Sequence, residues 1–178
     1  MPRKATRRRR PPKALAKWVD RALELGATHA KIIPAREVYT AAWVRLKCQY
    51  GCGGYGKKLT CPPYSPTPEQ TAQVIACYDW ALLIHMDEWR ELREFVVDLE
   101  REIFVDGYHK ALGFSAGSCT ICEQCNVPGP CRHGGRARPS MEASGIDVFA
   151  TARKAGYPIQ VVRDYDCRQN YYGLILIT

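Results

Sequence analysis

Apolar residues spaced three or four positions apart mark the first helix of the chain. Within residues 13–25 these positions are Leu15, Trp18, Val19, Ala22 and Leu25. Gly26 follows, and glycine commonly ends a helix because it adopts a left-handed backbone without steric cost. Residues 88–105 have the same periodicity and are followed by Gly107. The pattern therefore predicts helices over residues 13–25 and 88–105.

Shorter apolar runs without helical spacing predict the strands. They cover residues 28–33, 80–85, 110–114, 159–162 and 172–177. The run at 80–85 contains no polar residue before His85, which is typical of a strand buried on both faces of a sheet. Residues 37–47 fit either a helix or a strand, so the pattern leaves that segment open.

Capping residues predict further helices. Thr67 stands at an N-cap position, Pro68 follows at the first helical position, and Gln70 stands where a capping box needs Glu or Gln. These residues predict a helix that runs to about residue 77. Ser140 and Asp147 can each cap a helical turn later in the chain.

Helices that alternate with short buried strands predict an α/β or α+β sandwich built on a mixed sheet. The chain of 178 residues is long enough for one domain with a substantial core, which we assign to residues 13–178. Two loops rich in cysteine interrupt the pattern, at residues 48–66 and 117–139. Their cysteine spacings differ, which argues against a duplicated ferredoxin.

Positive charge gathers at the start of the chain. The formal net charge is +8, and seven of the 26 basic residues lie within the first 13 positions, so the remainder is nearly neutral. Residues 1–12 are predicted to form a disordered basic tail, and binding to nucleic acid is expected only through this tail. The simpler interpretation is that the tail is merely solvated, as runs of like charge commonly are.

Composition predicts a soluble protein of the cytoplasm. Hydrophobic residues make up 46% of the chain and charged residues 25%, and no apolar run approaches the length of a membrane span. Pro11 and Pro12 follow the basic start where a secretory signal would have an apolar core. In the reducing cytoplasm, nine cysteines favour metal binding over disulfides.

The second loop contains the densest cysteine pattern. Cys119, Cys122 and Cys125 are spaced CxxCxxC, and Cys131 follows after five residues. Thiolates at every third residue suit a 4Fe-4S cluster, although Arg132 stands where bacterial ferredoxins have proline after the fourth cysteine. Cys131 is therefore a ligand either of the same cluster or of another. Zinc is the alternative metal, but its ligands usually come from two well-separated CxxC pairs.

The first loop supplies a second, smaller set of thiols. Cys48, Cys52 and Cys61 are spaced CxxxC and then eight residues, and Cys61 is followed by two prolines. The spacing differs from the CxxxCxxC of radical enzymes that use S-adenosylmethionine. Three cysteines are one ligand short of a fully thiolate-bound 4Fe-4S cluster. A cluster here therefore needs a distant fourth ligand or leaves one iron open to bind substrate.

The remaining candidates are weaker. Cys77 lies on a predicted helix and is expected to be a buried apolar residue, so Cys167 is the better extra ligand. His133 is a candidate nitrogen ligand, although a histidine in an arginine-rich loop is usually a surface residue. Basic residues near both loops either stabilise a reduced cluster or form a solvated rim. They are Lys47, Lys57, Lys58, Arg132, Arg136 and Arg138.

Three longer motifs resemble the DUF2284 family of predicted metal-binding proteins. They are VRLKC at residues 44–48, YGKKLTCPPYSPTPEQT at residues 55–71 and RPSMEASGIDVFATARKAG at residues 138–156. CTICEQC and PCRH stand between the last two. The resemblance implies a metal bound by Cys119, Cys122, Cys125 and Cys131, and it implies no particular reaction. The basic tail is not part of the family pattern.

Three functions remain open on these observations. The leading hypothesis is a cytoplasmic iron-sulfur protein that passes single electrons to or from a redox partner protein. The second is an enzyme that binds substrate or sulfur at an open iron of the Cys48, Cys52 and Cys61 set, with electrons supplied by the other cluster. The third is a zinc-stabilised module that binds nucleic acid or protein. The chain has no nucleotide-binding fingerprint and no HExxH pair, and no catalytic residue is assigned.

Overall fold

The computed structural model describes residues 10–157, 159–164 and 166–178, so most of the predicted basic tail lies outside the described residues. The α-helices are α1 (Ala16–Glu24), α2 (Ala42–Gly51), α3 (Pro68–Ile75), α4 (Trp89–Val105) and α5 (Val148–Ala155). The strands are β1 (His29–Pro34), β2 (Trp80–Met86), β3 (Leu112–Phe114) and β4 (Tyr171–Leu176). Short 3-10 turns are η1 (Lys13–Leu15), η2 (Ala35–Glu37) and η3 (Glu142–Ser144).

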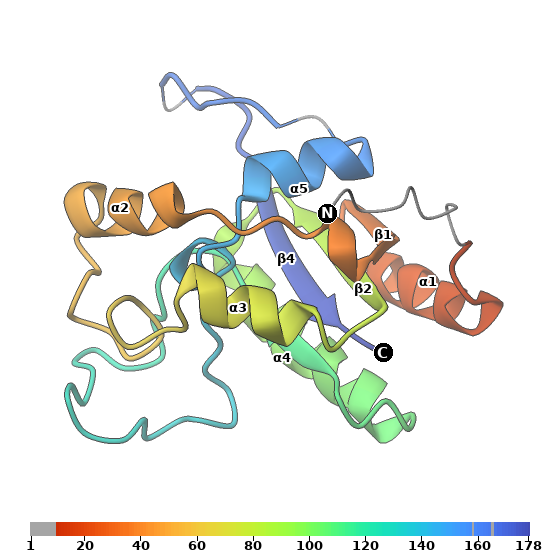
Figure 1. Ribbon diagram of the computed structural model, residues 1–178, viewed down its shortest axis with the longest axis horizontal. Helices are drawn as coiled ribbons and strands as arrows, with labels where there is room; N and C mark the ends of the chain where they lie inside the picture. Colours follow the sequence, from red (N-terminus) through yellow and green to blue (C-terminus); the bar gives the residue numbers. More distant parts are fainter. Residues whose placement is uncertain (1–9, 158, 165) are drawn as a thin grey trace, which may run out of the picture.

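The strands form one sheet in the order β1-β2-β4-β3 (Figure 1). The predicted α/β or α+β class is confirmed, but every strand pair in the described sheet is antiparallel, whereas a mixed sheet was predicted. The helix α4 connects β2 to β3, and these two strands run in the same direction. They do not pair because β4, the last strand of the chain, lies between them and pairs with both.

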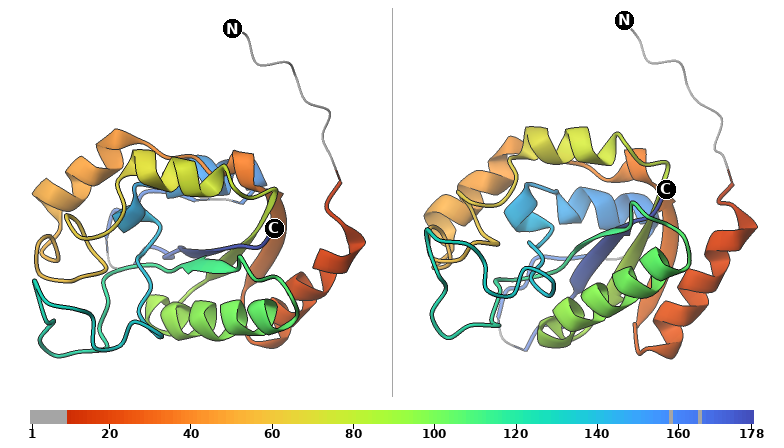
Figure 2. Two further views of the ribbon diagram at one scale, coloured as in Figure 1. Left: turned by 60° about the horizontal axis from the view of Figure 1, so that its bottom comes forward. Right: turned by 90° about the horizontal axis from the view of Figure 1, so that it is seen from below.

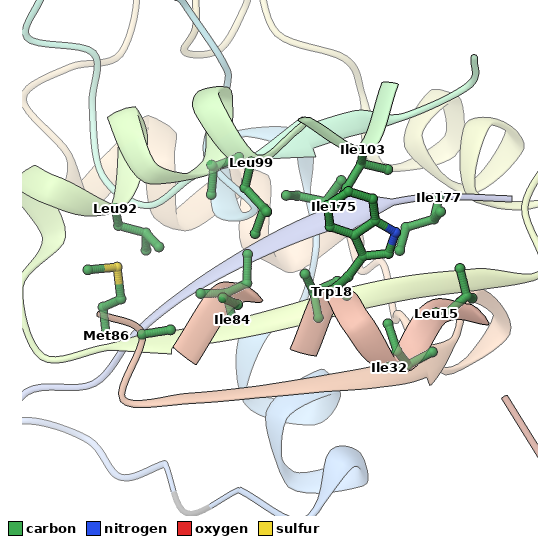
Figure 3. Packing of buried hydrophobic residues seen from close by; sticks show 14 of the residues in the cluster. Leu15, Trp18, Ile32, Ile84, Met86, Leu92, Leu99, Ile103, Ile175 and Ile177 are labelled. Atoms are coloured by element: carbon green, nitrogen blue, oxygen red, sulfur yellow. The ribbon is translucent and has the colours of Figure 1, made fainter. Parts of the chain in front are cut away.

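One face of the sheet packs against α1 and α4. Trp18 of α1 and Leu99 of α4 meet Ile84 and Ile175 of the sheet in one buried cluster (Figure 3). These side chains come from alternate positions of the strands, because successive residues of a strand point to opposite faces. The amphipathic spacing of both helices is therefore explained by this face.

The opposite face packs against α3 and α5 (Figure 2). Ile75 of α3 and Ala152 of α5 join Leu83 and Leu174 in a second buried cluster. The sheet is thus covered on both sides, and every residue of β2 is buried, as its continuous apolar run predicted. None of the described helices is long and apolar enough to cross a membrane.

Several segment boundaries differ from the prediction. Residues 159–162 are not a strand, and Val161 is 72% exposed. Both edges of β4 are already paired, so this apolar stretch has no free edge there to join. The undecided segment 37–47 contains the start of helix α2, which continues past Cys48 to Gly51. Cys48 therefore belongs to the last turn of a helix, although it was predicted to lie in the first cysteine loop.

His85 is a buried polar residue of β2. Its Nε2 lies 2.9 Å from Oδ1 of Asn170, and its Nδ1 lies 3.2 Å from Nδ1 of His29. Burial lowers the pKa of His85 below its ordinary value of 6.5, because the charged imidazolium loses contact with water. The neutral form of this histidine is therefore the one that the fold favours.

Acid is expected to destabilise the fold through His85. The folded chain binds this proton less readily than the unfolded chain, so the contribution to the free energy of unfolding is complete above pH 6.5 and is lost as the pH falls. Urea unfolding should show a lower midpoint at about pH 5 than at about pH 8. His85→Gln cannot titrate and should reduce this difference. An undiminished difference in the variant would assign the effect to other groups.

Candidate metal centre

The two cysteine loops lie side by side at one end of the molecule (Figures 1 and 2). The first loop leaves α2 and leads into α3, whereas the second connects β3 to η3. A direct contact joins them, because the Leu59 amide donates to Sγ of Cys125 at 3.4 Å. The fold therefore brings together thiols that are distant in the sequence.

Hydrogen bonds from α2 and to η3 hold the first loop. The guanidinium of Arg45 donates to the carbonyl oxygens of Pro63, Ser65 and Pro66 at 2.9 to 3.3 Å. The Ser65 hydroxyl is buried and donates to the carbonyl oxygen of Ala143. A loop fixed at several backbone atoms places its thiols in a defined position, which a metal site requires.

Cys48, Cys52 and Cys61 form the first thiol group. A side chain added at Gly54 would begin 3.6 Å from the sulfur atoms of both Cys52 and Cys61. Burial raises the pKa of Cys48, and the neighbouring Cys52 thiol raises it further. Burial likewise raises the pKa of Cys61 to about 11, with smaller contributions from Cys52, Cys48 and Cys119. A bound cation would favour the thiolate form of these groups.

Cys119, Cys122, Cys125 and Cys131 form the second thiol group. All four line one small cavity, together with Leu59, Thr60 and His133. The ammonium of Lys58 donates to the carbonyl oxygen of Cys122 at 3.4 Å. His133 is exposed but borders the same cavity as these thiols. The structure thus gathers the four cysteines that the spacing singled out.

Cys119 lies between the two thiol groups. It lines the cavity of the second group, and its thiol is close enough to Cys61 to raise the pKa of that residue. Its neighbour Ser118 also approaches the first group, since a Cβ at Gly54 would lie 3.7 Å from Cβ of Ser118. The two groups are therefore adjacent rather than independent.

Helix α4 holds the second loop through three arginines. Arg138 forms a two-pronged pair with Glu100, with both N···O distances at 2.7 Å. Arg93 donates to the Thr120 hydroxyl at 2.9 Å, and Arg136 lies 3.7 Å from the carboxylate of Asp98. Arg138 therefore anchors the loop to α4, and Lys58 contacts the same loop at the Cys122 carbonyl. The sequence alone predicted these basic residues either as neighbours of a cluster or as a solvated rim.

The two leftover cysteines lie elsewhere. Cys77 follows the end of α3 and is exposed, so the prediction that it is buried within a helix is wrong. Its sulfur donates to the carbonyl oxygen of Gln73. The Cys167 amide donates to the carboxylate of Asp164, and Cys167 borders neither thiol group in the described cavities. The structure therefore does not bring Cys167 to the first group as a fourth ligand.

A cavity of about 510 Å³ opens beside the first thiol group, whose three cysteines form part of its wall. This volume lies within the range of small-molecule sites. Aromatic side chains line much of the remainder: Trp43, Tyr55, Phe149, Tyr171 and Tyr172. Lys47 and Glu142 are the charged residues of the cavity that lie nearest the thiols. Lys47 precedes Cys48 in α2, and the Cys48 sulfur lies 3.9 Å from the carbonyl oxygen of Glu142. A ligand in this cavity would lie next to the thiols.

The described side chains do not form a preassembled site for a single metal ion. Among the residues that the structure describes, no three His, Cys, Asp or Glu side chains are grouped closely enough to hold one metal ion. A single zinc ion needs its thiolates at about 2.3 Å, which would require these side chains to move together.

A family model described as "Predicted metal-binding protein (DUF2284)" matches residues 31–177. The chain belongs to this family. Both thiol groups and the cavity beside them lie inside the matched range, and the basic tail lies outside it. Membership indicates metal binding and leaves the identity of the metal open. No curated protein and no solved structure matches the chain.

Sequence reasoning did not find the walls of the cavity. Glu142, Phe149 and Tyr171 come from separate segments that meet only in the folded chain. A clue was nevertheless present, because the third family motif, residues 138–156, contains both Glu142 and Phe149. The motif alone does not place either residue at a cavity, because the other walls come from segments that are distant in the sequence.

Proposed function

We propose that this protein is a redox protein that binds iron-sulfur clusters at both thiol groups. Cys119, Cys122, Cys125 and Cys131 would hold one 4Fe-4S cluster. Cys48, Cys52 and Cys61 would hold a second cluster with one iron free of thiolate. The observation that carries the proposal is that seven thiols, six from the two loops and Cys48 from the last turn of α2, line two adjacent cavities.

Backbone amides directed at sulfur support a cluster. Besides the Leu59 amide at Cys125, the Gly54 amide donates to Sγ of Cys52 at 3.4 Å. Such hydrogen bonds stabilise the more negative, reduced form of a cluster and raise its reduction potential. The Lys58 ammonium, held near Cys122, favours the reduced form in the same way.

Exposure favours electron transfer at the second group. Cys131 is exposed, and Cys122 and Cys125 are half-buried, so a redox partner protein can approach this end of the molecule. Cys61 and Cys119 connect the two groups. We propose that electrons enter through the second group and pass to the first by this route.

The cavity favours a second candidate function, chemistry on a bound small molecule at the first group. Cys48, Cys52 and Cys61 border a space of about 510 Å³, whereas the cavity of the second group admits only about 20 Å³. An iron without a thiolate ligand supplies a Lewis acid there when the cluster is bound. The protein itself supplies the aromatic walls that exclude water and the charged groups that orient a ligand.

Metal analysis of anaerobically purified protein tests the proposal. About eight irons with matching acid-labile sulfide per chain are expected for two clusters, and about four for one. Cys122→Ala should lose the iron of the second group, and Cys52→Ala the iron of the first. Cys77→Ala is the matched control, because this exposed thiol borders neither group in the described cavities.

Two results would contradict the proposal. Unchanged iron content in Cys52→Ala would show that the first thiol group holds no cluster. A colourless protein with stoichiometric zinc would contradict both clusters and favour the zinc-stabilised module, whose binding to nucleic acid should weaken as salt is added.

A further inference from the structure

Lys47 and Glu142 stand out among the residues of the large cavity because their charges are opposite and unpaired. Within the described part of the chain, neither side chain forms an ion pair. Both residues have exposed surface and line the same cavity, so both can meet a ligand there. The Glu142 carboxyl itself is poorly solvated, and this burial raises its pKa above the ordinary value. The hydroxyl of Ser140 is the side-chain partner of the Glu142 carboxylate.

Neighbouring charged groups are already engaged. Arg45 donates to three carbonyl oxygens of the first loop. Asp147, which also lines the cavity, caps α5 by accepting the Ala150 amide at 2.9 Å. Lys47 and Glu142 are therefore the charged groups of the described cavity that remain to recognise a ligand.

The rest of the cavity wall favours an apolar body. Tyr55, Phe149 and Tyr171 present aromatic rings from the first loop, α5 and β4. Small-molecule sites commonly combine such apolar walls with a few charged groups that fix orientation. The volume of about 510 Å³ admits a small molecule together with a group held by the thiols.

We propose that this cavity binds a hydrophobic α-amino acid. Its carboxylate would meet the Lys47 ammonium, its ammonium group would meet the Glu142 carboxylate, and its side chain would lie against the aromatic walls. A simple carboxylic acid would leave Glu142 facing a like charge, and a simple amine would do the same to Lys47. The inference deepens the proposed function, because the ligand would border the three-thiol site.

Calorimetric titration of the full-length, anaerobically purified protein tests this ligand class. The probes are L-phenylalanine and two analogues that each lack one charge, 3-phenylpropionate and 2-phenylethylamine. Glycine serves as the probe without an apolar body. L-Phenylalanine should bind at least about tenfold more tightly than each of the others, since each lost charge contact weakens binding by about that factor.

Charge-specific variants identify the residues. Lys47→Met should weaken L-phenylalanine about tenfold and leave 2-phenylethylamine no weaker, whereas Glu142→Gln should weaken L-phenylalanine and leave 3-phenylpropionate no weaker. Lys154→Met and Glu91→Gln are matched controls, because neither residue lines the cavity. Melting temperature and metal content, measured for every variant, separate lost binding from lost folding.

Equal binding of all probes, or L-phenylalanine binding that survives both substitutions, would overturn the inference. The metal analysis distinguishes its failure from that of the proposed function. Iron-free protein that binds L-phenylalanine through Lys47 would contradict only the proposal of clusters. Iron-loaded protein that binds none of the probes would contradict only the proposed ligand.

Discussion

Replacement of Arg138 by Met is expected to lower the free energy of unfolding by about 3–5 kcal/mol. The guanidinium meets the Glu100 carboxylate at two distances of 2.7 Å, and the two side chains are only 18% and 10% exposed. Without Arg138, Glu100 would retain a buried charge with no cation to compensate it. Urea unfolding followed by circular dichroism at neutral pH measures this loss.

A second pair on the same helix provides the matched control. Arg21 contacts Glu102 with two distances of 2.8 Å, the same two-pronged geometry, but both side chains are 39% exposed. Water and salt screen that pair, so Arg21→Met should cost much less stability. Comparable losses in the two variants would show that burial does not set the strength of the Arg138 pair.

A double variant distinguishes the loss of the ion pair from the cost of leaving the Glu100 charge buried without a partner. Glu100→Gln combined with Arg138→Met removes both charges, and it should recover part of the stability lost in Arg138→Met. Recovery should be incomplete because Arg138 also donates to the carbonyl oxygens of Gly134 and Ala137, at 3.2 and 2.9 Å, and Met cannot replace these bonds. A Glu100 oxygen in turn accepts the Gly113 amide of β3 at 2.9 Å. Glu100 therefore joins the second cysteine loop to the edge of the sheet.

Elements determined by neighbouring residues could be predicted from the sequence. The capping box of Thr67 and Gln70 is formed as predicted, because each group bonds to atoms only three residues away. The buried strand β2 was identified from its unbroken apolar run. Its antiparallel pairing was not, because β4 is contributed by the end of the chain and no local pattern encodes its insertion between β2 and β3.

Predictions from apolar composition were wrong where packing against distant segments determines the structure. Residues 159–162 have the composition of a strand, yet Ile159, Val161 and Val162 line the large cavity instead. Cys77 resembled a buried helical residue, but α3 ends at Ile75 and leaves it exposed. In both cases the packing of other segments overrides the local preference.

The candidate site divides in the same way. Spacing singled out the cysteines, because most of them lie only a few residues apart in the sequence. The position of Cys119 beside Cys61 and the opposing charges of Lys47 and Glu142 depend on how α2, η3 and the second loop pack. These relations are long-range, so only the folded chain reveals that the first thiol group borders a cavity.

Gly145→Ala is expected to lower the free energy of unfolding by about 2–4 kcal/mol, because backbone strain and steric overlap with Pro68 act together. Gly145 ends η3 with a φ of +76°, a conformation that favours glycine. A Cβ there would also lie 2.9 Å from the backbone Cα of Pro68, which the capped start of α3 holds in place. Relief of this overlap requires η3 to move away from α3.

Gly26→Ala isolates the contribution of strain, because Gly26 has a φ of +104° and open space around its Cβ position. Its cost should be about 1 kcal/mol, and thermal and urea unfolding of the two variants measure the difference. Equal losses would show that contact with Pro68 is unimportant. Because η3 carries Glu142, displacement of η3 in Gly145→Ala should also weaken L-phenylalanine binding in the folded protein, whereas Gly26→Ala should leave it unchanged. The position of one glycine thus links the packing of α3 to the charge that would orient the ligand.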